Sequence, residues 1–220
     1  MALLTFPLGL AEFFDLLPIG QASCDLTEAL DVAQTGGGEV LKADLGPMLW
    51  SGQIDLALME HHEAAPLRPL LNLLRRAGAS FMVADPSRPW PRRDPGGVVL
   101  AASPGTPAIL AVGGSMRELS LKGLPAWYQI SRGDLVSFAY GGSPTRFALH
   151  EFVGEAQAAA NGQTALIEVN PPIRPGAAAD TAVQLIWPRC KAVLQPGATA
   201  GTSKNTITGD ASFAWTQTLR

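Results

Sequence analysis

The sequence predicts a mainly β fold that contains a small antiparallel barrel or sandwich. Four short apolar runs, at 135–140, 147–152, 164–169 and 182–187, are separated by turn residues rich in Gly, Ser, Asn and Pro. Runs of this length and spacing are typical of antiparallel strands joined by short turns. The 23 glycines and 18 prolines supply many turns, and the 47% of hydrophobic residues suffice for a core.

The first 60 residues are expected to be mostly extended. An apolar run at 26–32 and an alternating segment at 39–45 flank the turn 34–38 (QTGGG), which is flexible enough to close a hairpin. Polar and apolar residues alternate at 39–45 and again at 50–59. The alternation predicts two half-buried strands.

One helix is predicted from about Ala64 to Ala77, because leucines recur on a single helical face. Gly78 suits the position just after the helix, whereas Pro69 favours a late start. Residues 61–63 are then a solvated loop before the helix. The leucines of the stripe are Leu67, Leu70, Leu71 and Leu74.

Short apolar or alternating segments predict the remaining strands. They lie at 80–84, 98–102, 108–112, 117–121, 189–194 and 211–218.

Two breaks in composition predict the domain borders. Residues 86–97 are rich in proline, as in a linker or a rigid loop, and residues 196–209 are small and polar. We therefore expect one domain formed by 1–86 and 196–220, with a second domain, 87–195, inserted into it. Two domains in simple series are the alternative.

Charge and cysteine usage limit the classes of partner and compartment. A net charge of −3 gives no electrostatic reason to expect nucleic-acid or anionic-membrane binding. The apolar first 20 residues lack a basic start and include acids, which makes a poor signal peptide, and no stretch is apolar enough to span a bilayer. Cys24 and Cys190 are expected to be buried thiols, as in a protein made in the cytoplasm.

None of the motifs examined predicts catalysis, a metal or a cofactor. Adjacent histidines at 61–62 point in different directions, and His150 lies in a strand, where a cross-strand polar partner is expected. Ser115 lacks the second glycine of a nucleophile elbow, so a turn between strands is expected. The glycines at 36–38 precede no Lys-Ser or Lys-Thr pair, which excludes a phosphate loop.

Scattered carboxylates leave one enzymatic alternative open. Two acids facing each other across a groove would suit a glycan-cleaving enzyme, although their spacing is not specific. The candidates are Asp134, Glu151, Glu155 and Glu168.

Tryptophan and arginine residues are the candidates for partner contacts. Trp90 stands among prolines beside Arg92 and Arg93, and both residue types are enriched at protein interfaces. Packing of Trp90 onto its own domain is the equal alternative. Trp215 in the C-terminal strand is a further candidate contact.

Trp127 and Tyr128 are neighbours, so a strand would send one into the core and the other to the surface. Together with Trp90 they suggest an alternative function, in which aromatic rings serve as stacking platforms of a carbohydrate-binding, lectin-like module for attachment to a host surface.

The order of local phrases along nearly the whole chain is also informative. After the hairpin turn at 34–38 come a strand with Trp50, the leucine-rich helix and further short phrases. These phrases are FMVADP at 81–86, SRGD at 131–134, ALHE at 148–151, VNPPIRPG at 169–176 and PRCK at 188–191. In this order the chain resembles the distal tail proteins of long-tailed bacteriophages (siphoviruses), particularly small ones from phages and phage-like elements of alphaproteobacteria.

The resemblance implies a structural component of a virion and no enzyme. Such proteins form a hexameric ring at the tail tip, between the tail tube protein and the baseplate hub that carries the tail fibres or the receptor-binding apparatus. A β-sandwich "belt" domain with one helix forms the ring, and an OB-like or galectin-like barrel lies outside it. Synthesis takes place in the host cytoplasm.

A ring of this kind makes two further demands on the chain. Its heterologous contacts are expected to use edge strands, and 39–45 and 213–218 are the candidates. DNA passes through the lumen without specific binding, so few basic residues are expected to line it.

Overall fold

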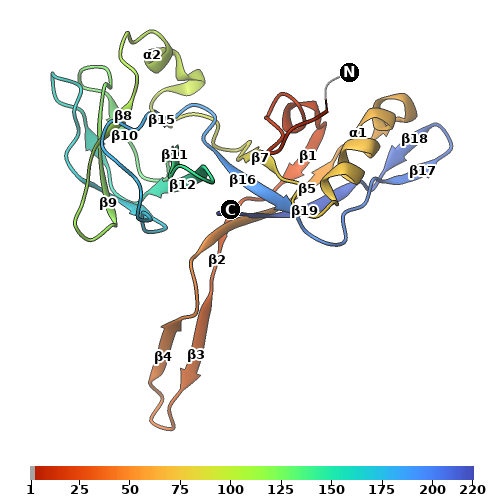
Figure 1. Cartoon of the computed structure of the whole chain (residues 1–220), viewed down its shortest axis with the longest axis horizontal. Coiled ribbons are helices and arrows are strands. Elements are labelled where there is room, and N and C mark those ends of the chain that lie inside the picture. The colour runs from red at the N-terminus through yellow and green to blue at the C-terminus, as the bar shows by residue number, and fades with distance from the viewer. Residues whose placement is uncertain (1–2) are drawn as a thin grey trace.

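The computed structural model describes residues 3–220 and confirms the mainly β fold, with 39% of residues in strands and 11% in helices. Figure 1 shows two bodies side by side, with a long hairpin projecting from one of them. One body is a sheet covered by a helix. The other is a sheet curled into a near-closed barrel.

The first body is built on a six-stranded antiparallel sheet in the order β1-β5-β19-β16-β7, with β2 also paired to β5. The C-terminal strand β19 lies between β5 and β16, in the middle of this sheet. The strands are β1 (Ile19–Ala22), β2 (Asp25–Thr27), β5 (Leu49–Leu56), β7 (Phe81–Ala84), β16 (Arg189–Leu194) and β19 (Ser212–Gln217).

Alternation along β5 and β19 explains the core of this body. Trp50, Ile54, Phe213 and Trp215 are all buried, as expected for alternate residues on the inner face of a sheet. Phe13, from the segment before the short 3-10 helix η1 (Phe14–Leu16), packs edge-on against Phe81 at 5.1 Å between ring centroids. The N-terminal segment therefore closes the core.

The long helix α1 spans His61–Leu74, three residues earlier than predicted at both ends. Glu60 caps it, because its side chain accepts from the helix backbone while Glu63 accepts from the Glu60 N–H at 2.9 Å. Pro66 and Pro69 lie inside the helix, so the late start inferred from Pro69 was wrong. His61 and His62 are therefore the first helical residues and not a loop.

Three small ribbons accompany the large sheets. One lies beside α1 and consists of β6 (Met59–Glu60), β18 (Ile207–Gly209) and β17 (Thr202–Lys204). The projecting hairpin consists of β3 (Leu30–Gln34) and β4 (Val40–Asp44), and a two-stranded ribbon on the barrel consists of β10 (Gln129–Ile130) and β13 (Ala156–Gln157).

The barrel is a six-stranded antiparallel sheet in the order β15-β11-β12-β14-β9-β8. Its edges meet where the Ile109 N–H donates to Thr181 O and the Val183 N–H to Pro107 O, both at 2.9 Å. Six strands are one more than the five of an OB-fold. They are β8 (Ala108–Val112), β9 (Glu118–Lys122), β11 (Leu135–Tyr140), β12 (Arg146–Phe152), β14 (Ile167–Asn170) and β15 (Val183–Gln184).

Two local predictions in the second half of the chain were wrong. Residues 98–102 form no strand but a short helix, α2 (Val98–Ala101), after the 3-10 turn η2 (Pro95–Gly97). The Asp94 carboxylate accepts hydrogen bonds from the Val99 and Leu100 N–H groups, both at 3.0 Å, and this fixes the helical turn. Of the strand expected at 182–187, only the two residues of β15 form.

The chain leaves the sheet after β7 and returns to it with β16. Since β16 pairs with both β7 and β19, residues 189–194 belong to the first sheet. The sequence-based division at 195/196 placed these residues in the inserted domain. In the structure the return crossing lies before Arg189.

The two bodies are held together where β5, β19 and residues 85–88 meet the outer face of β12. We call this region the joint. The indole N–H of Trp50 donates to Leu149 O at 2.7 Å, and the Gln217 amide donates to Phe147 O at 3.3 Å. Arg88 bridges Asp85 and Glu151 at 2.8 and 2.9 Å. Because these links connect distant parts of the chain, the bodies form one packed unit.

Candidate assembly surface

The hairpin β3–β4, which we call the arm (residues 30–44), is the most exposed regular element. Its five cross-strand pairs run from Leu30–Asp44 to Gln34–Val40. At the tip, the Thr35 N–H donates to Glu39 O and the Gly38 N–H to Thr35 O, both at 2.9 Å, with Gly38 at a φ of 84°. Figure 1 shows the arm pointing away from both bodies.

Every residue from Asp31 to Pro47 is exposed, so the strand predicted at 39–45 forms as β4 but is not half-buried. The cross-strand register places Val32 and Val40 on one face of the arm and Leu41 on the other, so each face carries apolar side chains. Val32 is 57% exposed and Val40 is 51% exposed. A lone two-stranded hairpin is marginal in water, and contiguous exposed apolar surface is typical of interaction sites.

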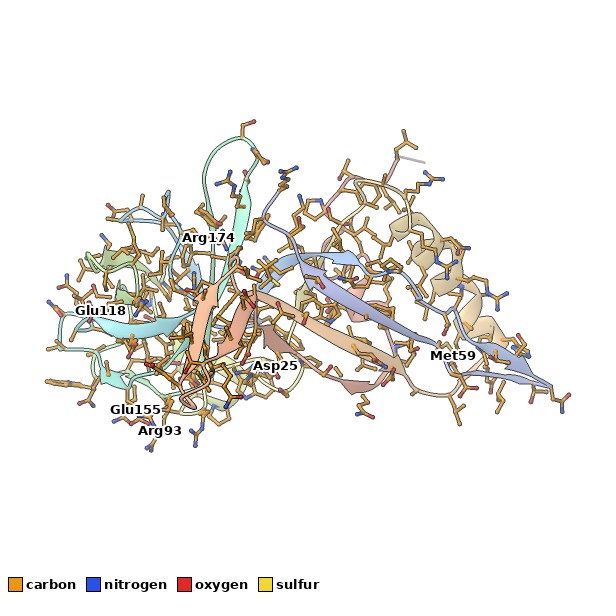
Figure 2. The ribbon with its side chains drawn as sticks, turned by 90° about the horizontal axis from the view of Figure 1, so that it is seen from below. Asp25, Met59, Arg93, Glu118, Glu155 and Arg174 are labelled. Atoms are coloured by element: carbon orange, nitrogen blue, oxygen red, sulfur yellow. The ribbon has the colours of Figure 1, made fainter. Side chains whose placement is uncertain are left out.

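A groove of about 480 Å³ lies between the foot of the arm and the barrel. Asp44 and Met48 line it from the arm side, and the proline-rich loop after β14 lines it from the barrel side. Arg117 and Arg174 face this groove together with Glu168 and Asp44, which gives it two charges of each sign. Figure 2 labels Arg174 on the barrel behind the arm.

The proposed partner contacts differ in exposure. Trp90 is 40% exposed, and Arg92 and Arg93 are exposed as well, so all three remain candidates. Trp215 is only 2% exposed and lies in a central strand. Trp215 is therefore a core residue and cannot meet a partner, and the strand expected to pair at 213–218 is not an edge.

The proline-rich segment 86–97 is a rigid crossing. Both carboxylate oxygens of Asp134 accept backbone hydrogen bonds, from the Arg92 N–H at 2.9 Å and the Ser131 N–H at 2.8 Å. Burial raises the pKa of Asp134, while these two N–H donors and the Arg92 charge lower it. The two hydrogen bonds to Asp134 and the bond from the Trp187 N–H to Pro89 O, at 2.6 Å, hold the segment in place.

The four carboxylates considered for glycan cleavage lie in different parts of the structure. Asp134 and Glu151 stabilise the chain crossing and the joint, as described above. Glu155 and Glu168 are exposed and line two different grooves.

Two of the histidines are held by hydrogen bonds. The ring nitrogens of His61 contact Thr208 Oγ1 at 2.8 Å and Asn205 O at 2.6 Å, which ties α1 to the β17–β18 ribbon. His150 is buried, and its Nδ1 lies 2.7 Å from Pro171 O rather than beside a cross-strand polar group. Within residues 3–220, no three His, Cys, Asp or Glu side chains are grouped as a metal site would need.

Cys24 and Cys190 are free thiols, and Cys190 is fully buried whereas Cys24 is half-buried. Burial raises the pKa of Cys24 to about 12 and that of Cys190 well above its usual value. Both side chains therefore stay protonated and unreactive near neutral pH.

The turn predicted at Ser115 is confirmed. Ser115 lies between β8 and β9, where the Met116 N–H donates to Gly113 O at 2.9 Å. Of the neighbours Trp127 and Tyr128, Tyr128 is buried and Trp127 is exposed, so one of the two enters the core as predicted, but they lie in a turn and not in the predicted strand.

Comparison with protein families and with curated proteins finds no match to this chain. In the part of the chain that the structure describes, no helix has the length and apolar character needed to cross a bilayer.

Two features of the surface were missed by sequence reasoning. The arm was predicted as a hairpin but not as a free projection, because alternation reports a pattern and not what covers it. The groove at its foot joins residues about 70 to 130 positions apart in the chain, and no local signal predicts such a contact.

Proposed function

We propose that this chain is a structural subunit of a bacteriophage tail tip, a distal tail protein. Copies of it form a hexameric ring between the tail tube protein and the baseplate hub, and DNA passes through the lumen without specific binding. The resemblance in the order of local phrases suggested this function. The arm is the single observation that supports it best.

The arm suits a ring because a closed cyclic assembly needs one surface that meets a different surface on the next copy. A hairpin with two unpaired edges and apolar side chains on both faces offers backbone and side-chain contacts at once. The groove at its foot offers a complementary surface with apolar and charged lining. The arm of one copy is therefore proposed to bind beside this groove on its neighbour.

The joint also suits a stable adaptor. In the described chain the buried carboxylate Asp134 and the ion-paired Arg88 and Glu151 stabilise the crossing and the joint. A rigid joint transmits position between the sheet body and the barrel, as a connector between tube and hub requires.

Charging one face of the arm should abolish the ring without unfolding the chain. In the double variant Val32→Glu, Val40→Glu, both changed side chains share a face and are more than half exposed, so stability should change by about 0.5 kcal/mol or less. Native mass measured by mass photometry should fall from that of the ring to that of one chain, 23.1 kDa.

The matched control is Leu166→Glu, because Leu166 is 49% exposed but lies on the barrel. This variant should keep the assembled mass. An assembled mass that persists in the double variant, with thermal unfolding unchanged, would rule out the arm as the ring contact.

A further inference from the structure

Trp127 has an exposed side chain and an unfavourable backbone conformation. It occupies the third position of the turn 125–128, in which the Tyr128 N–H donates to Pro125 O at 3.1 Å. Its φ is 63°, a region that this position of a turn usually reserves for Gly or Asn. The residue is 63% exposed, so core packing does not offset the strain. Strain of this kind concentrates at functional sites.

The turn is anchored on both sides of the indole. Tyr128 is buried, its hydroxyl lies 3.3 Å from Asp94 Oδ2, and its carbonyl accepts the Ala158 N–H at 2.8 Å. The side-chain amide of Gln157 donates to the carbonyl oxygen of Trp127 at 3.2 Å. The backbone that presents the indole is therefore fixed before any ligand binds.

A shallow polar groove of about 220 Å³ begins at this anchor. Gln129 and Gln157 stand directly opposite each other in the β10–β13 ribbon, so their side chains share one face. Arg93 and Glu155 supply its charged groups, and Figure 2 shows these two residues together at the lower edge of the barrel. The rest of the lining is Ile130, Ser131 and Ala156. The groove thus offers two amides, one guanidinium and one carboxylate, with no net charge.

We propose that Trp127 and this groove bind a neutral saccharide. The apolar C–H face of a pyranose ring would stack on the indole, whose π-face is electron-rich. Its hydroxyls would exchange hydrogen bonds with the amides of Gln129 and Gln157, which both donate and accept, and with Arg93 and Glu155. This site is independent of the arm and of ring formation.

Two other ligand classes fit the groove less well. A single-stranded nucleic acid also stacks on tryptophan, but it needs a positive channel, whereas Arg93 and Glu155 cancel and the chain is acidic overall. A protein partner would favour an apolar centre depleted of charge, and the four side chains named above are polar.

The test is binding of the full-length chain to arrayed oligomers of glucose, galactose, mannose and N-acetylglucosamine. The wild-type chain should bind at least one of them. Trp127→Gly should lose about tenfold or more in affinity, while its melting temperature stays equal or rises, because glycine adopts a positive φ without strain. Gln129→Ala should also weaken binding, since it removes groove contacts but not the turn anchor.

Trp187→Gly is the matched control, because Trp187 is another exposed indole at a positive φ, 47°, lies outside the groove and should leave binding unchanged when it is replaced. The proposal is overturned if none of the four oligomers binds, or if Trp127→Gly binds as the wild type does. It is equally overturned if Trp127→Gly lowers the native mass, because the indole would then be a contact between protein chains.

Discussion

Replacing Trp50 by alanine should lower the free energy of unfolding by about 3–5 kcal/mol, the usual cost of truncating a buried aromatic side chain. Trp50 is 1% exposed, and its indole N–H donates to Leu149 O across the joint at 2.7 Å. Its backbone N–H donates to the Gln217 side chain, which in turn reaches Phe147 O. The substitution therefore opens a cavity in the core and breaks a link between the two bodies.

Trp50→Phe separates these two effects. It keeps most of the ring but leaves the buried Leu149 carbonyl without its donor, which should cost about 1–3 kcal/mol. Urea unfolding followed by circular dichroism measures both variants, and Trp90→Ala, at a partly exposed position, should stay within about 0.5 kcal/mol of the wild type. A loss below about 1 kcal/mol for Trp50→Ala would show that the joint does not stabilise the fold.

Acid should weaken the barrel through His150. The pKa of His150 is lowered from 6.5 to about 4, chiefly by burial and also by the nearby Arg174 charge, although the hydrogen bond to Pro171 O opposes both. Since Pro171 O can only accept, the Nδ1 atom carries the proton, and Nε2 is buried without a partner among the described residues. A second proton on this ring would place a charge inside the barrel.

The sign of the pH effect follows from the lowered pKa. Near neutral pH the ring is neutral in both states, but between pH 6.5 and about 4 the unfolded chain takes up a proton that the folded chain excludes. Stability is thus lost as the pH falls through this window, by up to about 3 kcal/mol from this group, and the loss levels off below the folded pKa.

His150→Gln should remove this component, because glutamine keeps a donor for Pro171 O and does not titrate. The difference in unfolding free energy between wild type and variant should shrink or reverse as the pH falls from neutral to about 4.5. Leu121→Ala, at a buried position on β9, which does not pair with β12, is the control and should destabilise by the same amount at every pH. A wild-type-to-Gln difference that does not change with pH would contradict the assignment.

Much of the fold could be predicted because its signals are local. The strands β8, β11 and β16 lie at the predicted residues, since each is a short apolar run between turn residues. The leucine stripe predicted the helix, but its start was misplaced because Pro69 favoured a late start, whereas the cap at Glu60 starts the helix earlier. The apolar run 98–102 predicted a strand, but hydrogen bonds to the Asp94 side chain stabilise a helical turn there.

The surface could be predicted less well, because exposure depends on the arrangement of distant segments. Trp215 is a tryptophan in an alternating strand, as a residue at a protein interface could be. Only the sheet order shows that its strand is central. The arm has the alternation of a half-buried strand, yet nothing in the described chain covers it. Trp127 gave no local sign that its φ would be positive.

The most direct test of the central claim is electron microscopy of the purified full-length chain. The proposal predicts annular particles with sixfold symmetry and an open centre, of about six times the 23.1 kDa mass of one chain. The proposal would be contradicted if the wild-type chain gave only compact particles of one or two chains, without an opening, at every protein concentration.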